Sequence, residues 1–94
     1  MDELYLYARA GCHLCDDTRR ALVLLLAERR AAGLPSPTLV ERDIDTNDDW
    51  QRAFMTSIPV VELSGQRLEL ATSPSRIRQL LADVLDAPAA APRG

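Results

Sequence analysis

Apolar and polar residues follow two different periods along the chain, and each period predicts a different kind of element. Residues 3–8 are rich in Leu and Tyr and lead into Ala10-Gly11, which predicts a short strand followed by a turn. From residue 12 or 13 to residue 32, apolar side chains recur three and four positions apart, as on the buried face of a helix. The helix is expected to end at residues 33–35, because glycine suits the left-handed position after a helix and proline cannot continue one.

A second strand and a second helix are expected in the middle of the chain. Residues 38–44 have the β-branched and apolar content of a strand, although Leu39 and Val40 interrupt its alternation. Strand, helix and strand in succession normally form a unit with parallel strands and a right-handed crossover. Residues 47–55 begin with a capping residue and carry Trp50 and Phe54 four positions apart, which predicts a short helix with both aromatic side chains facing the core.

A hairpin and a final helix complete the pattern. Residues 60–63 and 66–70 flank a Ser-Gly turn and predict an antiparallel hairpin, with Pro59 at the first position of its leading strand. Ser73 followed by proline predicts a helix start, and apolar residues then recur on one face at Ile77, Leu80, Leu81, Val84 and Leu85. The order βαβαββα implies an α/β architecture similar to the thioredoxin fold, a four-stranded mixed sheet with helices on both faces.

Length and composition indicate one soluble globular domain. The chain has 94 residues, of which 47% are hydrophobic and 27% charged, enough to bury a single core. We assign this domain to residues 1–86, and we expect residues 87–94, with two prolines and no periodic face, to form a flexible tail. The net charge is -3 and all 11 basic residues are Arg, without a basic stripe, so nucleic acid is not expected as a partner.

The expected cellular location of the protein limits the roles that its two cysteines can have. The acidic residues 1–3 lack the features of a signal peptide, and the longest apolar run, residues 21–27, is far shorter than the roughly 20 residues that span a bilayer. We therefore expect a cytoplasmic protein without a membrane span. In a reducing compartment a cysteine pair is rarely a structural staple, so its expected role is catalytic, redox-sensing or metal-binding.

Cys12 and Cys15 stand three positions apart at the predicted start of the first helix. The unpaired N–H groups and the positive end of a helix dipole favour a thiolate there, and the thiolate is the reactive form. At this spacing the two sulfurs can bond, with Cys12 exposed on the cap and Cys15 one turn inside. We expect Cys12 to attack a target disulfide and Cys15 to resolve the mixed disulfide.

Neighbouring charges are expected to tune this thiol in opposite directions. A helix terminus contributes about 0.3–1 kcal/mol per favourable charge, whereas a pKa unit corresponds to about 1.4 kcal/mol, so the dipole alone moves a thiol by less than about one unit. A protonated His13 would add to this effect, and Asp16 and Asp17 would oppose it. The sequence leaves the redox potential open.

Other functions of the cysteine pair stay open at this point. A CxxC pair is also half of a zinc site, but the chain holds one His and two Cys in total, so a four-coordinate metal would need Asp16 or Asp17, or a second chain. A metal or iron–sulfur carrier and a non-catalytic redox-sensing module are therefore the alternatives. A pair of inert core cysteines is disfavoured, because Gly11 and His13 place the motif in an exposed turn.

The cysteine motif, Arg9 and the segment Ser57-Ile58-Pro59 resemble a known family. Over residues 3–86 the chain resembles the glutaredoxin branch of the thioredoxin superfamily, specifically small bacterial glutaredoxin-like proteins with a Cys-His-Leu-Cys motif. The resemblance implies that Pro59 is cis and lies against the cysteines, and that the backbone of Ile58 binds an extended peptide or glutathione. It also matches Arg9 to a basic residue that pairs with a glutathione carboxylate.

Two departures from the family pattern bear on the reductant. His13 replaces the proline usual after the first cysteine, and residues 68–73 replace the Gly-Gly and acidic segment that holds the glutamyl end of glutathione. Thr72 and Ser73, at the start of the last helix, remain candidates to receive an anion. We expect no tightly bound cofactor, a monomer that acts on disulfide-containing proteins, and either glutathione or a thioredoxin-reductase-type enzyme as electron donor.

Overall fold

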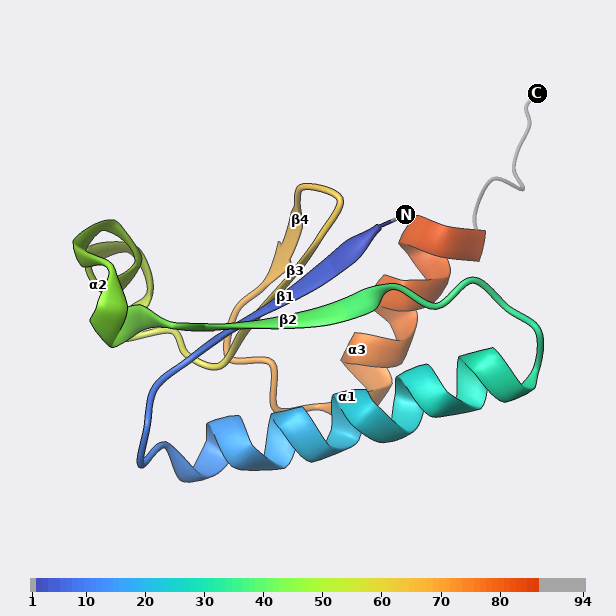
Figure 1. The fold of residues 1–94 in the computed structure, drawn as a ribbon, viewed down its shortest axis with the longest axis horizontal. Coiled ribbons are helices and arrows are strands. Elements are labelled where there is room, and N and C mark those ends of the chain that lie inside the picture. Colours follow the sequence, from blue (N-terminus) through green and yellow to red (C-terminus); the bar gives the residue numbers. More distant parts are fainter. Residues whose placement is uncertain (1, 87–94) are drawn as a thin grey trace.

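A computed structural model of the chain describes residues 2–86 (Figure 1). Its strands are β1 (Glu3–Ala8), β2 (Thr38–Asp43), β3 (Val60–Leu63) and β4 (Gln66–Leu68). Its helices are α1 (His13–Ala31), α2 (Asp48–Phe54) and α3 (Pro74–Leu81), with two short turns, η1 (Ile44–Thr46) and η2 (Ala82–Asp86). The predicted βαβαββα order is confirmed, and the predicted tail, 87–94, lies outside the described residues.

The four strands form one mixed sheet in the order β2-β1-β3-β4. β1 and β2 run parallel, with Leu4 opposite Leu39, and α1 connects them. β3 runs antiparallel to both β1 and β4. The β3–β4 hairpin turns through Ser64 and Gly65, whose φ angles of 50° and 82° give the two left-handed positions that a tight hairpin turn requires.

Helices cover the two faces of the sheet unequally (Figure 1). On the aliphatic face, which carries Leu4, Leu6, Val61 and Leu63, the strands pack against apolar residues of α1 and α3. On the aromatic face, the cluster around Tyr7 and Val60 packs against Ile44 of η1 and Phe54 of α2. The aliphatic face therefore holds the larger core, and α1 brings its own N-terminus to one end of that face.

The ends of the helices follow the local sequence. Cys12 occupies the N-cap of α1, and Gly33, just beyond the C-cap, has a φ of 75°, as the sequence predicts. Ser73 caps α3 and Pro74 takes its first position, also as predicted. The chain continues through η2, a wider turn of the π type. Within the described residues, no helix is both long enough and apolar enough to cross a membrane.

Several predicted boundaries differ from the structure. β2 ends at Asp43, because Ile44 begins η1 and the Asp43 side chain accepts a hydrogen bond from the N–H of Asp45 at 2.9 Å. β4 ends at Leu68 rather than residue 70, because Leu70 has a φ of 50° and turns the chain away from β3. Pro59 precedes β3 and does not belong to it.

The two aromatic residues of α2 are buried to different extents. Phe54 is buried, whereas Trp50 is half-buried and packs edge-on against Tyr7 with ring centroids 5.8 Å apart. The prediction that both face the core is thus correct for Phe54 and only partly correct for Trp50.

Candidate active site

The cysteine pair lies at the junction between β1 and α1. Gly11 has a φ of 79°, and the N–H of Cys12 donates to the carbonyl of Arg9 at 3.3 Å, so the chain turns sharply after the strand. The Cys12 carbonyl then accepts from the N–H of Asp16 at 3.1 Å, which is the first hydrogen bond of the helix. The turn and the cap together place both cysteines at the sheet edge where β1 ends.

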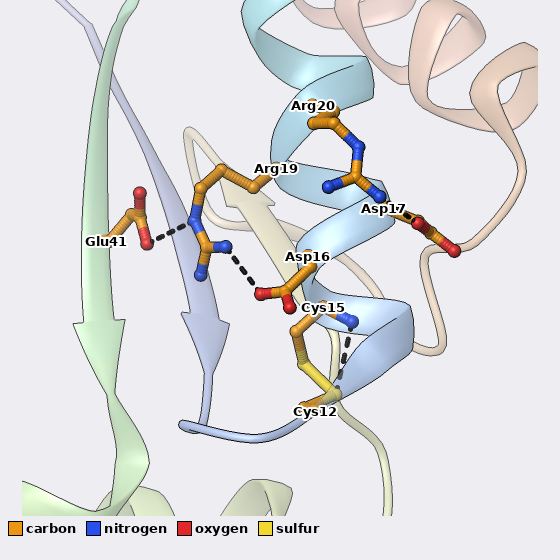
Figure 2. Close-up of polar contacts among 7 residues, drawn as sticks. All are labelled: Cys12, Cys15, Asp16, Asp17, Arg19, Arg20 and Glu41. Atoms are coloured by element: carbon orange, nitrogen blue, oxygen red, sulfur yellow. Dashed lines mark hydrogen bonds and ion pairs between the residues drawn. A yellow bond between two sulfur atoms is a disulfide. The ribbon is translucent and has the colours of Figure 1, made fainter.

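Cys12 and Cys15 are joined as a disulfide (Figure 2). Their Cα atoms lie 5.2 Å apart, within the ordinary disulfide range of about 4.4–6.8 Å. The two residues differ in exposure, since Cys12 is half-buried and Cys15 is fully buried in the cluster of the aliphatic face. A reactant from solvent therefore meets Cys12 first.

A backbone N–H is directed at the outer sulfur. The N–H of Cys15 lies 3.1 Å from Sγ of Cys12 and donates to it, so the sulfur takes the position of an N-cap side chain (Figure 2). In the reduced protein such a donor, at the positive end of a 19-residue helix, favours the Cys12 thiolate over the thiol.

The two acidic residues near the start of α1 are paired with arginines (Figure 2). Asp16 accepts from Arg19 at 2.7 Å, and Arg19 also donates to Glu41 of β2 at 2.7 Å. These hydrogen bonds, with Asp16 first and Glu41 second, raise the pKa of Arg19. Asp17 pairs with Arg20 in the same way. The opposition that the sequence predicts from Asp16 and Asp17 is therefore weakened, because a guanidinium compensates each carboxylate. The His13 side chain is exposed.

Arg9 is held by a carboxylate of this chain. Its Nη2 lies 2.8 Å from Oδ1 of Asp45, and its Nε lies 3.2 Å from each Asp45 oxygen. Gln51 adds a third donor to Oδ1 at 3.1 Å. The hydrogen bonds from Arg9, followed by the one from Gln51, hold the pKa of the Asp45 carboxyl below its usual range. The guanidinium that the family resemblance matches to a residue binding a ligand carboxylate thus already has a partner within the chain.

Asp45 is a residue that the sequence analysis missed. Arg9 follows β1 and Asp45 lies shortly after β2, and because β1 and β2 are parallel, their carboxyl ends meet at the same edge of the sheet. An acidic residue after the second strand of the parallel pair was therefore the signal that could have identified it.

The Ile58–Pro59 peptide bond is cis, as the family resemblance implies. Ile58 is half-buried and packs against the cluster that contains Cys15, and Pro59 is fully buried. The N–H of Ile58 donates to the carbonyl of Phe54 at 3.1 Å, so one of its backbone groups is used within the chain. The carbonyl of Pro59 accepts from Ala71 at 2.8 Å, which joins the proline segment to the loop that follows β4.

Thr18 is a second residue that the sequence analysis missed. It lies one turn after Cys15, is 2% exposed, and its hydroxyl donates to the Ala71 carbonyl at 2.7 Å. Because Ala71 also binds Pro59, this hydrogen bond ties the cysteine helix to the proline segment. A hydroxyl side chain on the otherwise apolar face of α1 was the signal in the sequence.

Thr72 and Ser73 lie on the same loop. The Ser73 hydroxyl caps α3 at 3.4 Å from the N–H of Arg76, and the N–H of Thr72 donates to the Leu70 carbonyl at 2.7 Å. Both groups therefore have partners within the chain. For the metal alternative, residues 2–86 contain no group of three or more His, Cys, Asp and Glu side chains that could hold an ion.

Comparisons with known proteins agree with this fold. An X-ray structure of the structural genomics target protein XcR50 from X. campestris is 27% identical, with a TM-score of 0.69 over 85% of this chain and 96% of that chain. Oxidised mitochondrial thioredoxin 3 from Saccharomyces cerevisiae is 18% identical, with a TM-score of 0.63 over 87% of this chain and 77% of that chain. A malarial protein is also 18% identical, with a TM-score of 0.61 over 88% of this chain and 96% of that chain.

Sequence comparison adds the family. No curated protein sequence matches the chain significantly. A family model described as a glutaredoxin-like domain (DUF836) matches residues 3–85. That match and the Cys12–Cys15 pair support a redox-related role. With its thioredoxin-type fold and a match over nearly its whole length, the chain belongs to the family of glutaredoxin-like domains (DUF836).

Proposed function

We propose that this protein is a thiol-disulfide oxidoreductase that reduces disulfides in other proteins, with Cys12 as the nucleophile and Cys15 as the resolving thiol. The observation that carries the proposal is the unequal exposure of two bonded cysteines at a helix start, with Cys12 half-buried and Cys15 fully buried. The N–H of Cys15, 3.1 Å from Sγ of Cys12, supports a reactive thiolate at the outer position.

The proposed reaction is a pair of thiol-disulfide exchanges. The Cys12 thiolate attacks one substrate sulfur, forms a mixed disulfide, and releases the other substrate sulfur as a thiolate. Cys15 then loses its proton and attacks Sγ of Cys12, which releases the second substrate sulfur. The two cysteines lose two electrons, the substrate disulfide gains them, and the released thiolates take up protons. The reverse exchange with a reductant restores the dithiol.

The surroundings of the disulfide support a protein as substrate. Leu14, between the cysteines, is 48% exposed, and Leu70, whose N–H bonds to the carbonyl of Ser57, is 58% exposed. Both residues lie on segments that adjoin the cysteine pair or the half-buried Ile58, and exposed apolar side chains there support an extended polypeptide as substrate. The proposal includes a cytoplasmic location, and glutathione or a thioredoxin-reductase-type enzyme as reductant.

Trapping with single-cysteine variants tests the assignment. Reduced Cys15→Ser, incubated with a disulfide-containing protein such as insulin, is expected to form a covalent adduct that persists without reductant, because Cys12 can attack but nothing resolves the product. The matched Cys12→Ser variant is expected to form none. Non-reducing electrophoresis and mass spectrometry measure both. Equal adducts from the two variants would overturn the roles of the cysteines. A wild-type protein without a reversible two-electron change across glutathione redox buffers would overturn the function itself.

A further inference from the structure

Arg9 precedes the attacking cysteine, Cys12, by three positions. Its carbonyl accepts the N–H of Cys12 at 3.3 Å, so the residue belongs to the turn that presents the nucleophile. Its side chain also lines an open cleft of about 280 Å³, whose charged lining includes Arg9, Asp16, Arg19, Glu41 and Arg42. Neither cysteine lines this cleft, but the Arg9 backbone is hydrogen-bonded to Cys12, so an anion bound at Arg9 would lie next to the turn that carries the nucleophile.

Asp45 cancels the charge of that guanidinium. The two side chains form a fork of three short contacts, at 2.8, 3.2 and 3.2 Å, while 33% of the Arg9 side chain and 44% of the Asp45 side chain remain exposed. Gln51 holds the same carboxylate at 3.1 Å, so Asp45 is oriented from a second side. The pair is thus preformed, and it is also reachable from solvent.

One of the two other arginines that line the cleft is also compensated. Arg19 lies between Asp16 and Glu41 at 2.7 Å from each. An anionic reactant therefore meets, in Arg9 and Arg19, guanidinium groups that already have carboxylate partners, whereas Arg42 contacts the Tyr5 ring and the Tyr7 hydroxyl. An uncharged reactant loses nothing from this arrangement, because it needs no cation.

We propose that Asp45 is a specificity-determining residue that occupies Arg9 and so biases exchange at Cys12 away from small anionic thiols and disulfides such as glutathione. This inference rests on the proposed thiol-disulfide exchange. Its physical basis is that a ligand carboxylate must compete for the charge of Arg9 with Asp45, which is already in place and, as part of the same chain, loses no translational entropy on binding. Electrons would then come from a protein reductase and not from the glutathione pool.

The inference is tested with three small disulfides of different charge. The second-order rate constant for oxidation of the reduced protein is measured by quenched-flow mass spectrometry with oxidised glutathione, which is anionic, hydroxyethyl disulfide, which is neutral, and cystamine, which is cationic. In each case the protein dithiol becomes a disulfide and the reagent becomes two thiols. Relative to wild type, Asp45→Asn is expected to raise the anionic-to-neutral rate ratio by about two- to fivefold, the effect of one exposed ion pair, and to lower the cationic-to-neutral ratio.

Two further variants separate a local effect from a global one. Asp49→Asn removes the same charge from an exposed pair with Arg52 on α2, and is expected to leave both ratios close to those of wild type. The double variant Arg9→Gln/Asp45→Asn is expected to lose the gain, because the gain requires the freed guanidinium. Raising the salt to about 1 M, where the screening length is about 3 Å, is expected to shrink the difference.

The outcomes distinguish the two proposals. Unchanged ratios in Asp45→Asn, or an equal gain in Asp49→Asn or in the double variant, would overturn the role of Asp45 and leave the exchange reaction standing. A wild-type protein that none of the three disulfides oxidises would overturn the proposed function instead.

Discussion

The two faces of the sheet are covered by different kinds of side chain. On the aliphatic face, Leu4, Leu6, Val61 and Leu63 are each 0% exposed beneath α1 and α3. On the aromatic face, Arg42 lies 3.8 Å from the ring centroid of Tyr5 and donates to the Tyr7 hydroxyl at 2.9 Å. Helical cover there comes mainly from the seven residues of α2 and the short turn η1.

The aliphatic face is held by apolar packing, whereas the aromatic face is held in addition by hydrogen bonds and contacts of polar groups. The aliphatic face is covered by the buried sides of the 19-residue α1 and of α3, and the disulfide lies at the end of that face because Cys15 is part of its cluster. A thinly covered face must satisfy its polar atoms locally, which it does by linking Tyr7 to Glu62 at 3.0 Å and to Arg42. We therefore expect mutations on the aliphatic face to be costly and those on the aromatic face to be milder.

The largest effect is expected for Leu6→Ala on the aliphatic face. The side chain is 0% exposed, so its truncation leaves a cavity among packed neighbours and is expected to lower the free energy of unfolding by about 2–5 kcal/mol. Urea denaturation measures the change. Val40→Ala, at a half-buried position on β2 opposite Tyr5 of the aromatic face, is the control and is expected to cost about 1 kcal/mol or less. An equal loss in both variants would contradict the comparison of the faces.

An intermediate effect is expected for Thr18→Val, which removes the buried hydroxyl from the aliphatic side. The variant keeps the shape of the side chain but leaves the Ala71 carbonyl without its donor, which is expected to cost about 1–3 kcal/mol of unfolding free energy. Thr18→Ser retains the hydroxyl and is expected to cost about 0.8 kcal/mol for the lost methyl group. If urea denaturation finds the serine variant as unstable as the valine variant, methyl packing and not the hydrogen bond holds the loop.

The smallest effect is expected for Tyr7→Phe on the aromatic face. The hydroxyl donates to Glu62 and accepts from Arg42, so its loss is expected to cost about 0.5–1.5 kcal/mol near neutral pH. Urea denaturation at pH 7 measures this loss of unfolding free energy.

Tyr7 is also expected to make the free energy of unfolding depend on pH. Burial, followed by the hydrogen bond to Glu62, raises the pKa of Tyr7, although Arg42 opposes the shift. A raised pKa in the folded state stabilises the fold fully below about pH 10, the ordinary tyrosine value, and the stability falls as pH rises through the higher folded value. Unfolding free energies measured between about pH 9 and 12 should fall more steeply for wild type than for Tyr7→Phe. Parallel pH profiles for the two proteins would show that Tyr7 does not couple to folding.

Much of the fold could be predicted because it rests on local patterns. The helix after Cys12 is defined by its apolar spacing, and its end by Gly33. The start of α3 follows from Ser73 and its proline, and the hairpin from Ser64-Gly65. Predicted strand boundaries were wrong where a tertiary contact changed the path of the chain. At Leu70 the N–H donates to the Ser57 carbonyl at 2.9 Å, and the residue does not continue β4.

The position of Cys12 and Cys15 at a helix start could be predicted from sequence, since their spacing, Gly11 and the periodicity after them are properties of adjacent residues. The charges that surround them depend on how distant segments pack together. The partner of Arg9 is 36 residues away, and the partner of the Thr18 hydroxyl is 53 residues away. The physical reason is that parallel strand pairing sets which strand ends meet, and hydrogen bonds between distant residues depend on angles and distances that no local pattern encodes.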